Sequence, residues 1–268
     1  MRNIESEVIY ASDTANNEKL EAVKAQQEIV KIVKETGFSN YAETLDDLPS
    51  AFDLEKHRPV EEMHRCICCM DERTPYGVHS AGSGILLSDK DFDKYFKESK
   101  ADSISSHNGC GAAKLYAKKM GFDVKDADRI GREWAEKKAK EKNVPYIHLE
   151  VDKSFHYARV CYYDGTGKFN HAGVKGLPAG FVVGREYMSK NSSVDESRIA
   201  EEIISTHIDP DEEPLNSENP FLFVVVAETK EEMEKLKEEL FGLVGYLGDK
   251  VLIDGFIAPT LTINKQDD

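Results

Sequence analysis

The chain has 268 residues, of which 40% are hydrophobic and 32% are charged, and its formal net charge is -15 at pH 7. This length allows one large domain or two smaller ones with a buried core. The acidic excess argues against a basic nucleic-acid-binding face and against docking on anionic membranes. The sequence has neither an apolar leader segment nor a run of about eighteen apolar residues, so we expect a cytoplasmic protein without a membrane span.

The first sixty residues are polar and predict a helical arm. The stretch NNEKLEAVKAQQEIVKIVKETGF has the spacing of an amphipathic helix and ends at Gly37. A short helix or turn follows in DDLPSAFDLEKHRP. Because such an arm has little core of its own, we expect it to pack on the main body or on a partner subunit.

From about residue 61 onward, predicted strands alternate with predicted helices. The expected strands are MHRCICCM, SGILLS, ADSISSH, YIHLEV, YARVCYYD, FLFVVVAE and KVLIDGFI. The expected helices cover residues 111–120, 126–142, 196–207 and 230–247. This alternation predicts an α/β fold with a mostly parallel β-sheet flanked by helices. DGTGK, between Tyr163 and Phe169, predicts a hairpin turn, and no internal repeat is evident.

A cluster of proline and glycine in GVKGLPAGFVVG favours a boundary near residue 175. The expected organisation is therefore an N-terminal helical arm over residues 1–60 and an α/β core over residues 61–175. Residues 176–268 would form a C-terminal α/β extension, which either continues the same sheet or makes a small second lobe.

The cysteines predict a metal site. Three of the 5 cysteines fall within the four residues from Cys66 to Cys69, and reduced cytoplasmic cysteines more often bind metals than form disulfides. Cys69 ends a predicted strand, His107 ends a later one, and Cys110 opens the following helix. Ligands gather at the carboxyl ends of strands in α/β sheets, so these side chains could meet at one point. Two thiolates and one imidazole suit zinc, and three protein ligands leave a fourth position open, as in catalytic sites.

Two charged residues give the predicted site a chemical role. Asp71 follows Cys69 by two residues, and Arg73 follows Asp71 by two more. Zinc acidifies a bound water, and Asp71 could accept a hydrogen bond from the resulting hydroxide. Arg73 could hold Asp71 ionised through a forked ion pair.

The segments CMDER at 69–73 and HNGCG at 107–111 resemble the paired signature of the β-class carbonic anhydrases, Cys-x-Asp-x-Arg and His-x-x-Cys-Gly. SAGSG at 80–84 and RVCYYDGTGKFN at 159–170 are similar to two further segments of that family. The resemblance covers roughly the middle of the chain, from Cys66 to about Asn170.

The resemblance implies a zinc enzyme that reversibly hydrates CO₂ to bicarbonate by means of a metal-bound hydroxide. It implies Cys69, His107 and Cys110 as zinc ligands, with Asp71 and Arg73 as the orienting pair. It also implies a homodimer, or a multiple of dimers, in which the N-terminal helices embrace the neighbouring subunit.

Two other interpretations stay open. Cys66 could complete a closed, structural Cys₃His zinc site, although that site would give Asp71 and Arg73 no role. The same open site could instead hydrolyse another small linear molecule, such as carbon disulfide or carbonyl sulfide. By strand alternation Cys66 and Cys68 share one face and Cys69 lies on the other.

Two further residues are expected to have no part in the chemistry. Cys161 lies in a predicted strand and is expected in the core, where a free thiol behaves as a small hydrophobic side chain. His79 is expected in an exposed loop, and a role as a proton shuttle or an added metal ligand is the alternative for it.

Overall fold

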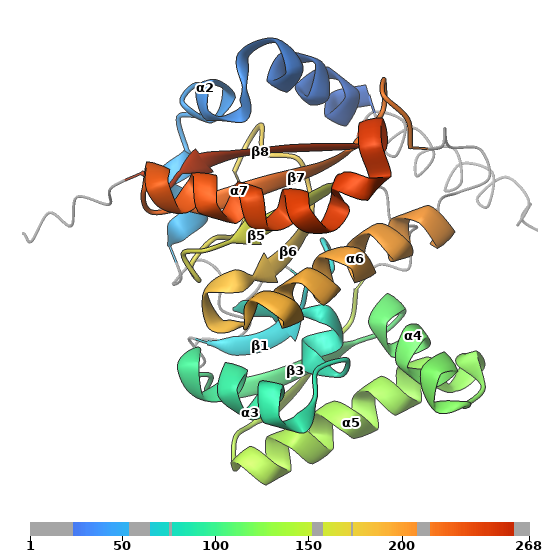
Figure 1. Ribbon diagram of the computed structural model, residues 1–268. Coiled ribbons are helices and arrows are strands. Elements are labelled where there is room, and N and C mark those ends of the chain that lie inside the picture. Colours follow the sequence, from blue (N-terminus) through green and yellow to red (C-terminus); the bar gives the residue numbers. More distant parts are fainter. Residues whose placement is uncertain are drawn as a thin grey trace, which may run out of the picture.

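The computed structural model describes residues 24–53, 65–74, 77–151, 158–172, 174–207 and 215–259. These residues form two four-stranded sheets with helices packed on them (Figure 1), and every strand pair is parallel. The predicted α/β class with parallel strands is therefore confirmed. In the described part of the chain, no helix combines the length and the apolar character that crossing a membrane requires.

The first sheet has the strand order β2-β1-β3-β4. Its strands are β1 (Cys66–Cys69), β2 (Val78–Ser80), β3 (Ser103–His107) and β4 (Tyr146–Leu149). The connecting helices are η3 (Ala81–Gly84), α3 (Asp89–Glu98), α4 (Gly111–Met120), η4 (Val124–Asp126) and α5 (Ala127–Lys142). The strand predicted at SGILLS is wrong, because this stretch begins in η3 and continues as a turn.

The second sheet has the strand order β6-β5-β7-β8. Its strands are β5 (Val160–Asp164), β6 (Phe181–Gly184), β7 (Phe221–Ala227) and β8 (Val251–Ile257). Its helices are η5 (Arg185–Tyr187), α6 (Lys190–His207), α7 (Lys230–Val244) and η6 (Gly245–Lys250). β5, β6 and β7 are buried throughout, which explains their continuous apolar runs, whereas β8 at the edge of the sheet is partly exposed.

The border between the two sheets lies before β5. The expected division placed the end of the core at residue 175, but β5 pairs with β6 and β7 and so belongs with the C-terminal strands. The predicted hairpin at DGTGK is wrong, because β5 and β6 run parallel. Instead, the carboxylate of Asp164 accepts hydrogen bonds from Thr166 and from the backbone N–H of Phe169, which closes a local turn after β5.

Both sheets use the same arrangement of strands, although no repeat is evident in the sequence. In each sheet the first strand lies between the second and the third, and the fourth lies outside the third. The helices that follow the second strands also begin alike. Ser88 before α3 accepts a hydrogen bond from the backbone N–H of Asp91 (3.1 Å), and Ser189 before α6 accepts one from Ser192 (3.2 Å). The repeat therefore lies in topology and helix capping, which a comparison of residues does not reveal.

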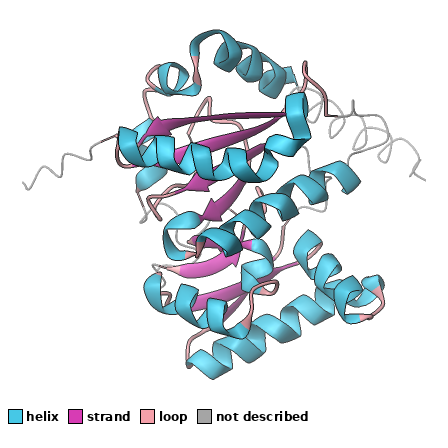
Figure 2. Cartoon of the chain, in the orientation of Figure 1, coloured by secondary structure: helices cyan, strands magenta, loops and turns pink. Residues whose placement is uncertain are grey.

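The two sheets contact each other through β2 and β6. In Figure 2 the strands of the second sheet lie above those of the first. The backbone N–H of Val182 in β6 donates to the carbonyl of Met70 just after β1 (3.0 Å). Gly184 lies so close to β2 that a Cβ there would be 3.1 Å from the carbonyl oxygen of His79. Elements of the second half thus lie directly against the C-terminal end of β1.

The N-terminal arm packs on the second sheet of its own chain (Figure 1). Its described part consists of a helix over residues 24–36, α2 (Phe38–Ala42) and η1 (Leu48–Phe52), and the beginning of the predicted helix, residues 16–23, lies outside the described residues. The ring of Phe38 stacks on that of Phe256 in β8 at 5.5 Å between centroids, and its backbone N–H donates to Asp254. We expected the arm to pack on the main body or on a partner subunit, and in this chain it packs on the main body.

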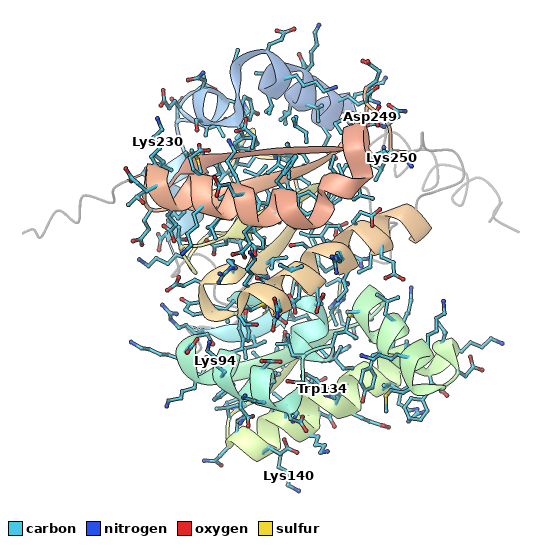
Figure 3. All side chains as sticks on the ribbon, in the orientation of Figure 1. Lys94, Trp134, Lys140, Lys230, Asp249 and Lys250 are labelled. Carbon is cyan, nitrogen blue, oxygen red and sulfur yellow. The ribbon has the colours of Figure 1, made fainter. Side chains whose placement is uncertain are left out.

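Charged side chains such as Lys94, Lys140 and Lys230 point outward from the helices (Figure 3).

Candidate metal centre

Three potential metal ligands converge at the carboxyl ends of β1 and β3. Cys69 is the last residue of β1, His107 is the last residue of β3, and Cys110 is the N-cap of α4. Their ligand atoms all lie within 4.8 Å of one another, and the two sulfur atoms are 3.8 Å apart. Each residue is at most 4% exposed. This buried Cys-His-Cys cluster could hold a metal ion.

The backbone explains why residues from two segments meet here. β1 and β3 are parallel neighbours with Ile67 opposite Ile104, so their C-terminal ends lie at the same edge of the sheet. Gly109 has φ 72°, a left-handed conformation that glycine adopts without strain, and it turns the chain from β3 into α4. Its N–H donates to Asp128 of α5 (2.8 Å), which holds this turn in place.

The imidazole of His107 is oriented for ligation through Nε2. Its Nδ1–H donates to the carbonyl of Asn108 (2.9 Å), so the lone pair of the neutral ring is on Nε2. The side chain of Asn108 is itself held by two hydrogen bonds to the backbone of Val151 (2.8 and 3.1 Å). Nε2 is buried and has no hydrogen-bond partner among the described residues. Since buried polar atoms nearly always have a partner, this nitrogen fits a metal ligand.

Asp71 and Arg73 form a forked ion pair beside the cluster. Arg73 Nε donates to Asp71 Oδ1 (2.8 Å) and Nη2 donates to Oδ2 (2.6 Å), while the backbone N–H of Arg73 also donates to Oδ1 (2.9 Å). Oδ2 lies 3.8 Å from His107 Nε2. The hydroxyl of Thr74 donates to the carbonyls of Cys69 and Asp71, which fixes the turn that carries the pair. Asp71 is only 4% exposed, so few waters compete for its oxygens.

The protonation of the cluster follows from burial and from mutual contacts. Burial raises the pKa of the Cys69 thiol well above its usual range, and the contact with Cys110 raises it further. The same contact lowers the pKa of Cys110. Burial disfavours a charge on His107, but Cys69 and Asp71 outweigh it and raise the pKa of the imidazole to about 9. Protons on Cys69 and His107 must therefore leave when the cluster takes up a cation.

Two neighbours of the cluster play a larger part than the sequence suggested. His79 was expected in an exposed loop, but it lies in β2, is 3% exposed, and contacts the carbonyl of Cys69 through Nδ1 (2.9 Å). Gly82 donates its N–H to Cys69 Sγ (3.3 Å). Gly82 has φ 56°, and a Cβ there would come within 2.6 Å of Ile85 and 3.1 Å of Ala112, so a larger residue would be strained at this position.

The remaining cysteines lie outside the cluster. Cys66 and Cys68 interact with each other, and Cys66 Sγ is 3.6 Å from the carbonyl of Ile67. Cys161 is fully buried in β5, in agreement with its expected place in the core. Within the described ranges, the ligand atoms that come together belong to Cys69, His107 and Cys110, and neither Cys66 nor Cys68 joins them. The third sulfur, which a closed Cys₃His site would need as its fourth ligand, is therefore not part of the cluster.

No protein-family model, no curated protein sequence and no solved structure matches this chain. What the chain does must therefore be inferred from its site.

Proposed function

We propose that this protein binds zinc at Cys69, His107 and Cys110 and catalyses the reversible hydration of CO₂ to bicarbonate. The observation that carries the proposal is the meeting of three soft donors with the Asp71–Arg73 ion pair at one buried point. The resemblance of CMDER and HNGCG to the signature of the β-class carbonic anhydrases supports the same chemistry.

The donor set fits zinc in type and in spacing. Zinc prefers thiolate and imidazole ligands at tetrahedral angles, and a Zn–S bond of about 2.3 Å places two thiolates roughly 3.8 Å apart. The sulfur atoms of Cys69 and Cys110 are 3.8 Å apart. His107 offers a third donor through its unpartnered Nε2. Three protein ligands leave a fourth tetrahedral position for water or substrate, as expected for a catalytic site.

The surrounding residues prepare this position for a small, neutral substrate. Bound zinc would supply a nucleophile near neutral pH by acidifying a water molecule. Both oxygens of Asp71 accept hydrogen bonds from Arg73, so the carboxylate is held rigidly as an acceptor 3.8 Å from His107 Nε2. Such an acceptor orients a hydroxyl group by fixing its proton. Each of the three ligand residues is at most 4% exposed, and a small, neutral substrate such as CO₂ suits a site buried to this degree.

A homodimer, or a multiple of dimers, stays a prediction of the resemblance. The described part of the N-terminal arm, which would embrace a neighbour there, packs on the second sheet of its own chain here. We therefore propose that any association of subunits uses other surfaces.

We expect one zinc ion per chain, bound with release of protons. From residue 158 onward the only cysteine is Cys161, so the second sheet has no means of duplicating the site. Because the pKa of His107 is about 9 and that of Cys69 is raised, protons compete with zinc below these values, and zinc affinity should rise with pH. Titration of chelator-treated protein in weak buffer with a pH indicator measures both quantities. Two zinc ions per chain, or binding without proton release, would contradict this assignment.

The proposed activity is tested by stopped-flow hydration of CO₂ on protein of known zinc content. We expect a rate proportional to bound zinc and absent from chelator-treated protein. Carbon disulfide and carbonyl sulfide are assayed in parallel to decide the substrate class. A higher kcat/KM for either compound than for CO₂ would identify that compound as the substrate in place of CO₂. Zinc-loaded protein that hydrates CO₂ no faster than buffer, and turns over neither sulfur compound, would rule out this function.

A further inference from the structure

A carboxylate from the second half of the chain reaches the first sheet. Glu196 lies in α6, which connects two strands of the second sheet, and it is 1% exposed. Its Oε1 accepts a hydrogen bond from the hydroxyl of Ser80 (2.5 Å), and its Oε2 accepts one from the backbone N–H of Ala81 (3.0 Å). Ser80 ends β2 and Ala81 begins η3, so Glu196 holds the point at which the chain leaves the strand.

This point is connected directly to a thiol of the metal cluster. Ser80 pairs with Cys69 across the two parallel strands, and its carbonyl accepts from the backbone N–H of Met70 (3.1 Å). One residue beyond Ala81, the N–H of Gly82 donates to Cys69 Sγ. A shift of Ala81 would therefore move the backbone N–H that donates to this sulfur, because Gly82 is the immediate neighbour of Ala81 in the chain.

The turn that Glu196 holds needs an external support. Gly82 and Ser83 both have positive φ, at 56° and 58°, and a left-handed conformation costs energy for serine. A buried carboxyl is itself costly, and burial raises the pKa of Glu196 to about 7 although Ser80 and Ala81 lower it. The buried carboxyl of Glu196, which costs free energy, thus lies where the strained turn contacts the sulfur of Cys69.

We propose that Glu196 is a positioning residue of the metal centre, contributed by the second half of the chain. It fixes the turn of residues 80–82 and so keeps the Gly82 N–H directed at the sulfur of Cys69. This inference rests on the proposed metal site but not on the proposed reaction. In its sheet, α6 corresponds to α3, and Glu196 stands seven residues after the capping Ser189, as Tyr95 stands seven residues after Ser88. Tyr95 donates to the carbonyl of His79, so both helices support the end of β2.

The test compares zinc affinity and the cobalt spectrum of variants at this contact. Glu196→Ala should weaken zinc binding about 10- to 100-fold, as for other residues that support a ligand, and should alter the sulfur-to-cobalt absorption of cobalt-loaded protein. Glu196→Gln should restore both, because its amide oxygen can accept from Ala81 while its NH₂ group donates to the Ser80 hydroxyl. Ser80→Ala should give a smaller loss. Asp195→Asn, on the exposed side of the same helix, should change nothing.

The outcomes separate this inference from the proposed function. A folded Glu196→Ala protein with unchanged zinc affinity and an unchanged cobalt spectrum would overturn it. Should Glu196→Ala not fold, Ser80→Ala with wild-type affinity and spectrum would overturn it equally. Wild-type protein that binds zinc but does not hydrate CO₂ would reject the proposed function and leave the role of Glu196 in place.

Discussion

Replacement of Cys110 by serine is expected to abolish zinc binding and CO₂ hydration together. Cys110 supplies one of the two thiolates, and a serine hydroxyl does not ionise to replace it, so the loss of affinity should exceed the roughly 100-fold typical of supporting residues. The fold should survive. Cys110 is the N-cap of α4 and makes no side-chain capping hydrogen bond, whereas serine is among the preferred residues at that position.

Two measurements on the same sample check this expectation. Metal analysis after dialysis gives the zinc content, and stopped-flow hydration gives the rate. Cys66→Ser is the matched control, because it makes the same chemical change to a buried thiol outside the cluster. It should keep both zinc and activity. A fully active Cys110→Ser protein without zinc would show that the cluster is not the reaction centre, and an inactive Cys66→Ser protein would show that the effect is not specific.

The Cys-His-Cys cluster could be predicted because its residues lie at strand and helix ends that the local sequence indicates. Cys69 and His107 each end an apolar strand, and Cys110 directly precedes a helix. Parallel strands bring their carboxyl ends to one edge, so the pairing of β1 with β3 is the one distant contact that the meeting of these residues requires. The fork between Asp71 and Arg73 is likewise formed within one short turn.

The arrangement of the two sheets could not be predicted, because it depends on contacts between distant segments. The apolar stretch SGILLS has the composition of a strand, yet its first two residues end the helix η3 with positive φ angles, 58° at Ser83 and 97° at Gly84. Gly84 also packs so closely against Phe92 that a Cβ there would lie 2.7 Å from the ring. β5 follows the first sheet in sequence but pairs with β7, some sixty residues later. Glu196 is separated from Ala81 by 115 residues, and nothing near it in sequence marks it as a neighbour of the cluster.

The second large effect is expected from Asp71→Asn, which should keep zinc but lose most of the hydration rate. An asparagine has one acceptor oxygen, so its NH₂ group must face one of the two Arg73 nitrogens that now donate to Asp71. The fork would open, and the position beside His107 would lose its fixed acceptor. We expect kcat/KM for CO₂ to fall about 10- to 100-fold, with zinc content unchanged.

Arg73→Lys extends this test, because lysine keeps the charge but cannot form the fork. If the fork orients Asp71, Arg73→Lys should be impaired in the same direction as Asp71→Asn, while the exposed Asp195→Asn should match the wild type. Hydration rates and zinc content are measured for all three variants. An Asp71→Asn protein with wild-type zinc content and a wild-type rate would remove the carboxylate from the chemistry. The cluster would then be explained better as a structural metal site that stabilises the first sheet. Such a site has no metal-bound hydroxyl, so it does not need the carboxylate of Asp71 as a hydrogen-bond acceptor.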